Sequence, residues 1–197
     1  MFTGIVESVG RVSRVRQDRT NTHFTIESPI SGQLKVDQSV SHNGVCLTVV
    51  QCDAASHTVT AIQETLVKTG LGALREGSAV NLERCMPADG RFDGHIVQGH
   101  VDGVGRVESI QDQQGSWQID ISYGPEIREV TVEKGSICVD GVSLTCFNSA
   151  ERSFSVAIIP YTWEHTTLGR LKPGDAVNLE FDIVGKYIRR MLRQQGH

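Results

Sequence analysis

The chain has 197 residues, of which 39% are hydrophobic and 21% charged, and its formal net charge is −4 at pH 7. This composition is typical of a globular protein, and the acidic balance argues against a nucleic-acid binder, which would carry a basic face. No apolar run approaches the roughly 20 residues that cross a bilayer. The start, MFTGIVESVGRV, lacks the regions of a signal peptide, so we expect Met1 to begin the working protein.

The cysteines indicate a reducing environment. There are five, Cys46, Cys52, Cys85, Cys138 and Cys146, and none belongs to a C-x-x-C motif. An odd number without that motif favours free thiols over a disulfide framework. We therefore expect a cytoplasmic protein.

In chain order, the first half predicts short strands followed by a helix. Alternating or β-branched residues predict strands at His23–Ser28, His57–Gln63 and Ala79–Arg84. Between the last two, ETLVKTGLGAL at Glu64–Leu74 predicts one short helix, with Gly72 near its end.

The second half predicts the same order of elements. Strands are expected at Trp117–Ser122, Arg128–Glu133, Ser153–Ile159 and Ala176–Phe181, with a short helix at Tyr161–Leu171 that contains Gly169. Short strands at this spacing, separated by Asn-Gly, Asp-Gly and Pro-Gly signals, favour closed antiparallel barrels, which leave no sheet edge exposed.

The tail predicts an amphipathic helix. Apolar side chains recur at helical spacing, and basic side chains take the other face: Ile183, Val184, Tyr187, Ile188, Met191 and Leu192 against Lys186, Arg189, Arg190 and Arg193. Periodicity alone leaves open whether the apolar face folds against its own barrel or forms an oligomer contact.

The two halves are copies of one unit. Residues 39–86 placed over residues 136–183 give 19 identities in 48 positions without a gap, and VGRV at Val9–Val12 returns at Val104–Val107. A repeat of about 95 residues predicts two paired domains and not a solenoid, which stacks three or more short units. We expect domains at 1–95 and 96–184, followed by a helix at 185–197.

The repeat changes two chemically distinctive residues. NGVCLTVV at Asn43–Val50 returns as DGVSLTCF at Asp140–Phe147, so that Cys46 becomes Ser143 and Asn43 becomes Asp140. Thr48 and Thr145 follow two residues after the Cys/Ser position, on the same strand face, which suggests a polar rim for a small ligand. The plainer interpretation is that Asn43 and Asp140 form ordinary turns with the glycines that follow them, and that Cys46 and Ser143 fill a small buried slot.

Other site chemistries are disfavoured. His95 and His100 in GHIVQGH lie five apart, which in a strand sends them to opposite faces, and no cluster of thiolates or carboxylates completes a metal site. DGVGRV lacks the third glycine and the following helix of a dinucleotide-binding loop, and no P-loop, G-x-S-x-G or H-E-x-x-H motif is present.

Six ordered motifs resemble the riboflavin synthase family of the alpha-chain type. They are MFTGIVE, SHNGVCLTV, ETL…TGLG, GHIVQGHVDGVG, DGVSLT and TTLG, and the likeness runs nearly end to end, with weaker detail at 13–38 and 108–128. The resemblance implies an all-β fold of two six-stranded antiparallel Greek-key barrels, followed by a C-terminal helix that assembles a homotrimer.

The resemblance also implies an activity. Members convert two molecules of 6,7-dimethyl-8-ribityllumazine into riboflavin and 5-amino-6-ribitylaminouracil by four-carbon transfer, without a metal or redox cofactor. Each barrel binds one molecule, and the working site joins a first barrel to the second barrel of a neighbouring subunit. Association with lumazine synthase is left open. One alternative is a non-catalytic antenna protein that binds lumazine or flavin. The other is a flavin-binding barrel of an oxidoreductase, which would need a nucleotide-binding partner domain for which we expect no length to remain.

The family motifs carry a set of site residues onto this sequence. The implied first pocket consists of Gly4, Ile5, Val6, Cys46, Leu47, Thr48, Thr60, Ala61, Ile62, Gln63, Glu64 and Thr65. The implied second pocket consists of Gly99, His100, Val101, Ser143, Leu144, Thr145, Ala157, Ile158, Ile159, Pro160, Tyr161 and Thr162.

The implied catalytic roles remain open among several groups. Ser143, Cys46, His100, Thr145, a water or a ribityl hydroxyl is the nucleophile or its base. Asp140 either tunes proton transfer or holds the turn. Phe2 matches an aromatic residue near the reacting rings, and Lys134 matches a lysine that reaches substrate across the subunit boundary.

Overall fold

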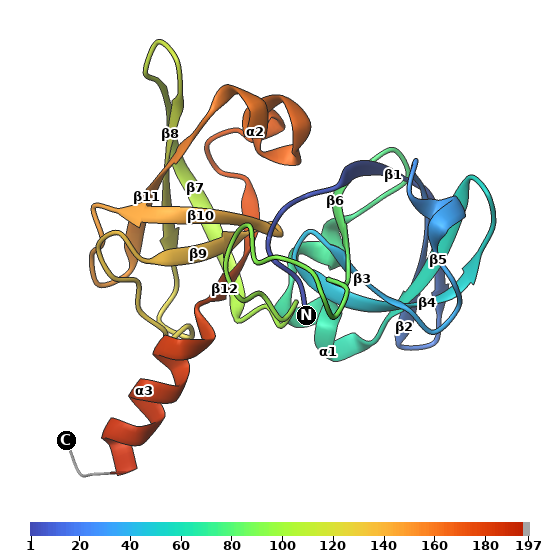
Figure 1. The fold of residues 1–197 in the computed structure, drawn as a ribbon, viewed down its shortest axis with the longest axis horizontal. Helices are drawn as coiled ribbons and strands as arrows, with labels where there is room; N and C mark the ends of the chain where they lie inside the picture. Colours follow the sequence, from blue (N-terminus) through green and yellow to red (C-terminus); the bar gives the residue numbers. More distant parts are fainter. Residues whose placement is uncertain (195–197) are drawn as a thin grey trace.

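The fold consists of two closed six-stranded antiparallel barrels side by side, with a helix leaving the second (Figure 1). The computed structural model describes residues 1–194. The first barrel contains β1 (Ser8–Asp18), β2 (Asn21–Glu27), β3 (Ser39–His42), β4 (Val45–Cys52), β5 (Ser56–Ala61) and β6 (Ala79–Arg84). The second contains β7 (Gly103–Asp112), β8 (Trp117–Tyr123), β9 (Ser136–Val139), β10 (Val142–Phe147), β11 (Ser153–Ile158) and β12 (Ala176–Phe181).

Both barrels have the same topology. The ring order is β1-β2-β5-β4-β3-β6 in the first and β7-β8-β11-β10-β9-β12 in the second, so each strand has a repeat mate in the same place. Even the register shift between Val12 and Arg14 in β1 returns between Val107 and Ser109 in β7. The predicted pair of barrels with a C-terminal helix is confirmed. The expected division at 1–95, 96–184 and 185–197 stays a prediction, and residues 195–197 lie outside the described part.

The barrels are filled by side chains. Along β4, Val45, Leu47 and Val49 are buried, whereas Cys46 and Thr48 between them are half-buried and exposed. Alternation of this kind sends every second side chain into a packed core and the others to the outer face. Any polar ligand site on these strands therefore lies on the outside of the barrel.

The predicted strand at Arg128–Glu133 is wrong, because this segment forms no strand. The apolar side chains of Val130 and Val132 are 62% and 63% exposed, so their alternation is not that of a half-buried strand. The six-stranded ring closes without this segment, which leaves it no strand to pair with.

Each predicted short helix is two pieces. The first is α1 (Gln63–Lys68) followed by the 3-10 turn η2 (Gly70–Ala73), and the second is α2 (Pro160–His165) followed by η3 (Thr167–Arg170); a further turn, η1, spans Ser31–Gln33. Thr69 and Thr166 divide the pieces. The Thr69 hydroxyl donates to the carbonyl of Thr65 at 2.7 Å and accepts from the N–H of Leu71 at 3.3 Å, and Thr166 repeats this pattern. A threonine that bonds both turns stops the first and caps the second.

The two barrels meet in a reciprocal seam. The Asn81 side chain donates to the carbonyl of Asp140, and Asn178 donates to the carbonyl of Asn43, both at 2.8 Å. At the centre the turns touch, since a Cβ on Gly44 would lie 2.9 Å from the N of Gly141. The repeat thus supplies both halves of its own interface.

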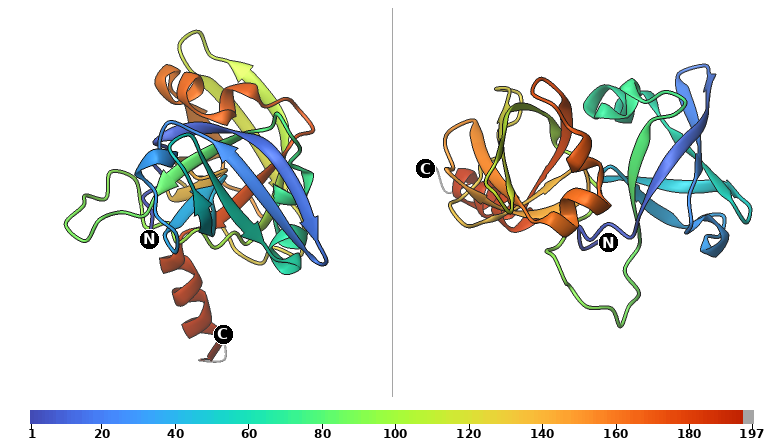
Figure 2. Two further views of the ribbon diagram at one scale, coloured as in Figure 1. Left: turned by 90° about the vertical axis from the view of Figure 1, so that its right-hand side faces the viewer. Right: turned by 90° about the horizontal axis from the view of Figure 1, so that it is seen from above.

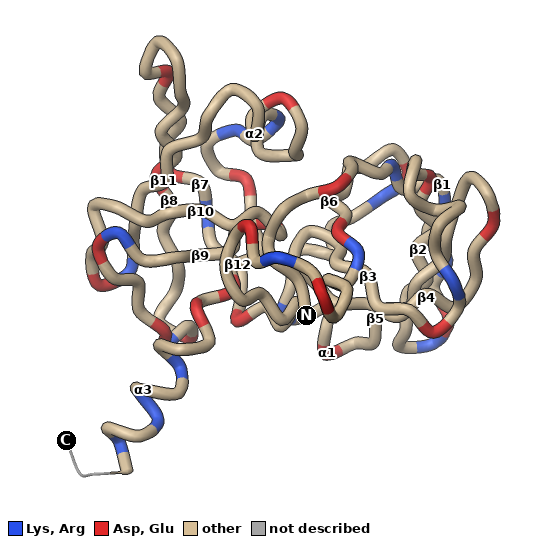
Figure 3. The backbone as a smooth tube through the Cα atoms, viewed as in Figure 1, with Lys and Arg blue, Asp and Glu red and all other residues tan. Residues whose placement is uncertain are grey.

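The last helix, α3 (Ile183–Gln194), projects away from both barrels (Figure 1). It carries basic residues and no acidic ones (Figure 3). Lys186 forms an ion pair with Asp102 at 2.7 Å, and Arg189 forms one with Glu129. Among residues 1–194, no helix combines the length and apolar composition needed to cross a membrane.

Candidate active site

A cavity of about 460 Å³ lies on the outer face of the second barrel. Its floor is the outward-facing side of β10 and β11, with Ser143 and Thr145 beside Ala157 and Ile159. The full lining is Ile5, Asp93, Gly94, Lys134, Ser136, Ser143, Leu144, Thr145, Phe147, Ala157, Ile159 and Thr162. A lining that mixes apolar side chains with several hydroxyl groups and one lysine suits a flat ring that carries a polar chain.

The serine of this cavity has a histidine partner. The Nδ1 atom of His95 lies 2.7 Å from the hydroxyl oxygen of Ser143. Burial lowers the pKa of His95 from its usual value, while the charge of Asp182 acts to raise it. A neutral imidazole that carries its proton on Nε2 accepts the Ser143 proton through Nδ1, and this is the arrangement of a nucleophile with its base.

Glycine at position 94 lets His95 reach the serine. A Cβ on Gly94 would lie 2.0 Å from the carbonyl oxygen of Thr3 and 2.9 Å from the Ser143 hydroxyl. Any side chain there would push the segment away from the strand. The residues belong to the linker between β6 and β7, which forms a long loop beside the N-terminus (Figure 2).

The first barrel repeats the polar face, but among residues 1–194 Cys46 has no hydrogen bond to a histidine of the kind that Ser143 has with His95. Cys46 is half-buried and Thr48 exposed on β4, beside Thr60 and Ile62 at the end of β5. The Thr60 hydroxyl lies 2.8 Å from Nδ1 of His23. Burial raises the pKa of the Cys46 thiol, and a hydrogen bond with Ser39 opposes that rise. A smaller hollow of about 270 Å³ lies beside Ser39.

The two backbone segments that contain Gly4 and Gly99 each contact the polar face of the other barrel. The carbonyl of Gly4 accepts the N–H of Ser143 at 2.7 Å, and the carbonyl of Gly99 accepts the N–H of Cys46 at 2.9 Å. Within one chain, Gly4 thus lies against the Ser143 face and Gly99 against the Cys46 face. The implied assignment of Gly4–Val6 to the first pocket and of Gly99–Val101 to the second stays a prediction. Ile5 lines the second cavity, and the exposed His100 follows the glycine that contacts Cys46.

Comparison with known proteins agrees with this duplicated architecture. The Lumazine binding domain family matches residues 3–85 and again residues 98–182. The riboflavin synthase of Actinobacillus pleuropneumoniae is 43% identical over 98% of this chain and 90% of its own length, and that of Mycobacterium tuberculosis is 41% identical over the whole of both chains. The chain belongs to the riboflavin synthase family.

Solved structures share the fold of this family member. The crystal structure of LumP complexed with 6,7-dimethyl-8-(1'-D-ribityl) lumazine has a TM-score of 0.84 and 22% identity, and covers 92% of this chain and 99% of its own. The structure of LumP complexed with riboflavin has the same TM-score at 24% identity, covering 91% of this chain and 98% of its own. At these identities the likeness concerns the fold.

The residues that the riboflavin synthase family implies do not all face a cavity. Leu47, Ala61 and Ile158 are buried with their barrel cores. At the strand ends, Gln63, Glu64, Pro160 and Tyr161 are exposed, whereas Thr65 and Thr162 are half-buried. Val6 and Val101 are half-buried and pack against the cores of the second and first barrels. Lys134 lines the second cavity, with its Nζ 5.7 Å from the centre of the Phe147 ring.

Two of the implied catalytic residues lie behind the site. Phe2 is fully buried in a cluster with Val97 and Cys138, and Cys46 packs against this cluster, so Phe2 lies in the support beneath that residue. Asp140 lies in the seam, where its carboxylate accepts the N–H of Asn178 at 2.8 Å, as Asn43 accepts that of Asn81. Burial raises the pKa of Asp140 to about 7.

Sequence reasoning missed His95, Asp93 and Ser136. His95 was weighed only as a metal ligand, and within residues 1–194 no group of three His, Cys, Asp or Glu could hold a metal ion. The linker has no counterpart at the front of the first repeat, so the repeat gave no signal for Asp93 or His95. Ser136 was detectable, because it aligns with Ser39 at the offset that joins Ser143 to Cys46.

Proposed function

We propose that this chain acts as a riboflavin synthase. It transfers a four-carbon unit between two molecules of 6,7-dimethyl-8-ribityllumazine and releases riboflavin and 5-amino-6-(D-ribitylamino)uracil, the last step of riboflavin biosynthesis. The observation that carries the proposal is the pair of equivalent polar faces at Cys46 and Ser143, in a chain whose curated riboflavin synthase relatives align over nearly its full length. Two identical substrates call for two similar pockets.

The working site is shared between subunits of a homotrimer. Both polar faces lie on the outer surface of a barrel, so a bound ring keeps one side uncovered until another surface closes over it. A four-carbon transfer needs the two rings face to face, and holding them so contributes roughly 7–11 kcal/mol in favourable cases. When the Cys46 face of one subunit packs against the Ser143 face of a neighbour, each bound ring is covered and the two rings lie face to face.

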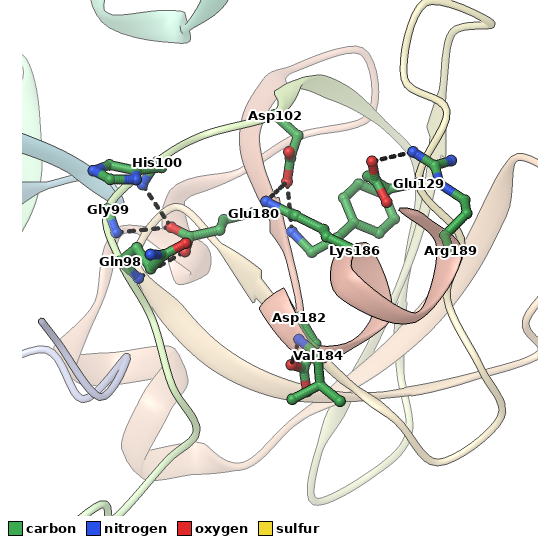
Figure 4. A network of polar contacts seen from close by, with 11 residues as sticks. Gln98, Gly99, His100, Asp102, Glu129, Glu180, Asp182, Val184, Lys186 and Arg189 are labelled. Atoms are coloured by element: carbon green, nitrogen blue, oxygen red, sulfur yellow. Dashed lines mark hydrogen bonds and ion pairs between the residues drawn. The ribbon is translucent and has the colours of Figure 1, made fainter. Parts of the chain in front are cut away.

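The C-terminal helix supports this assembly. Its basic side is held by its own barrel through the ion pairs of Lys186 and Arg189 (Figure 4). Its apolar side is exposed along the helix at Val184, Tyr187, Ile188, Met191 and Leu192. A helix with two of its four basic side chains paired to its own barrel and its apolar side exposed is arranged for an apolar partner, and we assign that partner to a second copy.

The chemistry begins with the acidic C7 methyl group of one lumazine. Its loss of a proton gives an anion spread over the ring, and a nucleophile that adds at C7 of the other lumazine prepares that second molecule for attack. We assign this addition to Ser143, with His95 as its base, because their 2.7 Å contact joins a hydroxyl to a neutral imidazole. Cys46, Thr145 and His100 then bind and orient the rings.

We also propose a cytoplasmic location, which the free state of all five cysteines supports. Association with lumazine synthase, the source of the substrate, belongs to the same proposal and is testable by co-sedimentation of the two purified proteins.

The test is turnover of the purified full-length protein with the lumazine substrate. Chromatography should show one riboflavin formed for every two lumazines consumed, and nothing in a reaction without protein. The alternative, an antenna protein that only binds, predicts quenching of lumazine fluorescence without riboflavin. Binding with no product would contradict the proposed activity.

A further inference from the structure

One buried carboxylate in each barrel holds a segment of backbone. Glu83 on β6 and Glu180 on β12 are repeat mates, and they are 5% and 3% exposed. Neither lines the cavity of the second barrel. Glu83 accepts from the N–H and hydroxyl of Thr3 at 2.7 and 2.8 Å and from the N–H of Gly4 at 3.0 Å.

Glu180 repeats this arrangement on the linker. It accepts from the N–H groups of Gln98, Gly99 and His100 at 2.7, 2.9 and 2.9 Å (Figure 4). A carboxylate that collects successive backbone N–H groups fixes the path of that backbone, because each charge-assisted bond constrains one peptide plane. Both held segments contain a glycine of positive φ, +77° at Gly4 and +79° at Gly99.

The held segments press on the Cys/Ser position of the opposite barrel. Besides their hydrogen bonds to Ser143 and Cys46, the two glycines make close contacts: a Cβ on Gly4 would lie 2.6 Å from the Cβ of Ser143, and one on Gly99 would lie 2.5 Å from the Cβ of Cys46. The backbone positions of Cys46 and Ser143 are therefore each fixed by a segment that is hydrogen-bonded to a glutamate of the other barrel.

We propose that Glu83 and Glu180 are positioning residues with crossed action. Glu83, in the first barrel, places Thr3–Gly4 and thereby sets Ser143 in the second pocket. Glu180, in the second barrel, places Gln98–His100 and thereby sets Cys46 in the first pocket. The consequence for catalysis rests on the proposed function, whereas the crossed positioning is a property of the fold.

Amide exchange tests the crossed positioning without any substrate. In the full-length protein, Glu180→Gln should speed hydrogen exchange at the Cys46 amide by at least about tenfold and leave the Ser143 amide within about twofold, because one clamp loosens and the other stays. Glu83→Gln should do the reverse. The matched control is Glu27→Gln, which removes an exposed carboxylate of the first barrel that pairs with Arg11 and should leave both amides unchanged.

A merely structural role predicts a different result. General loss of stability would speed both amides together in each variant, and a local effect would speed the amide of the mutated barrel. Either pattern, or no change at either amide, would overturn the proposal.

The functional consequence is tested by double-mutant cycles. If Glu83 acts through Ser143, then Glu83→Gln should lower kcat by less than about twofold in a Ser143→Ala background, but by about tenfold in the parent and in a Cys46→Ser background. Glu180→Gln should couple in the same way to Cys46→Ala, which removes the thiol that Cys46→Ser would largely replace. Additive effects in every pair would refute the link to catalysis. A protein with no turnover would contradict the proposed function and leave the exchange result to judge the positioning.

Discussion

The two changes between the repeat copies occupy different places. Asn43 and Asp140 lie in the seam, where each accepts a backbone N–H from its own sixth strand. Cys46 and Ser143 lie three residues on, at the polar faces. An oxygen acceptor is all that the seam position uses in both copies, so the exchange of Asn for Asp does not by itself point to catalysis. The exchange of Cys for Ser does, because Ser143 contacts His95.

The two pockets should respond differently to substitution. Ser143→Ala removes the hydroxyl that contacts His95 and leaves any substrate group it met unpaired, which costs roughly 1–3 kcal/mol, or about five- to a hundredfold. Cys46→Ser gives the first pocket the group already present in the second, so its effect should be small. The measurement is steady-state rate together with equilibrium titration of lumazine fluorescence.

The loss in Ser143→Ala should fall on turnover more than on affinity, because removing an interaction that is made only as the bound lumazine is attacked lowers kcat. The conservative variant Ser143→Cys serves as the control, since it keeps a nucleophile beside His95. Equal small effects from Ser143→Ala and Cys46→Ser would show that this position contributes only to packing and not to catalysis.

At the scale of elements, the internal repeat and the residue patterns within it predicted the two barrels and most of their strands. Strands with alternating burial such as β2, β5 and β8 follow from sequence, because each side chain reports its own face. The helix break at Thr69 did not, since a threonine inside a helical pattern shows its capping role only when its bonds are seen. Crossing segments are harder still. An alignment states that Gly4 and Gly99 are equivalent, but not which barrel each one contacts.

The exposed side of α3 yields a prediction about assembly. Ile188→Glu with Met191→Glu places two charges on side chains that are now 53% and 59% exposed, so the isolated subunit should keep its fold. Burying each of these apolar side chains stabilises a contact by roughly 1.5–3 kcal/mol, and a buried unpaired charge reverses that gain. Sedimentation velocity should show the variant as a monomer and the parent as a trimer.

Activity should fall with assembly if the site is shared. The control is Gln194→Glu, which adds a charge to the same helix outside this pair and should leave the trimer intact. A monomeric variant with full turnover would contradict the shared site, and a variant that remains trimeric would contradict the role of α3.

At the scale of the whole molecule, the barrels share a fold but not an interior. The first barrel buries His42 and His57 where the second has Val139 and Phe154. His42 Nδ1 lies 3.0 Å from the carbonyl of Val40, and its Nε2 lies 2.9 Å from Nε2 of His57. This series of hydrogen bonds continues from Nδ1 of His57 to the hydroxyl of Ser31 at 2.8 Å.

The hydrogen bonds in this series can point in only one consistent direction from donor to acceptor. A carbonyl only accepts, so His42 donates from Nδ1 and accepts at Nε2 from His57, which in turn accepts from Ser31. Both rings are neutral in this arrangement, and a second proton on His42 would set two N–H groups against each other. Burial lowers the pKa of His42 to about 3 and that of His57 to about 4, with the charge of His57 lowering His42 further.

Acid should therefore destabilise the first barrel more than the second. The unfolded chain takes up protons on these histidines near their usual pKa of about 6.5, whereas the folded chain takes them up only near 4 and below, so the free energy of unfolding falls as pH drops through that window. Between pH 7 and 4.5 the loss should be about 2 kcal/mol or more. The variant His42→Val with His57→Phe copies the second barrel and should lose less. Urea unfolding of both proteins at the two pH values measures the difference, and an equal loss in both would show that these histidines do not set the acid limit.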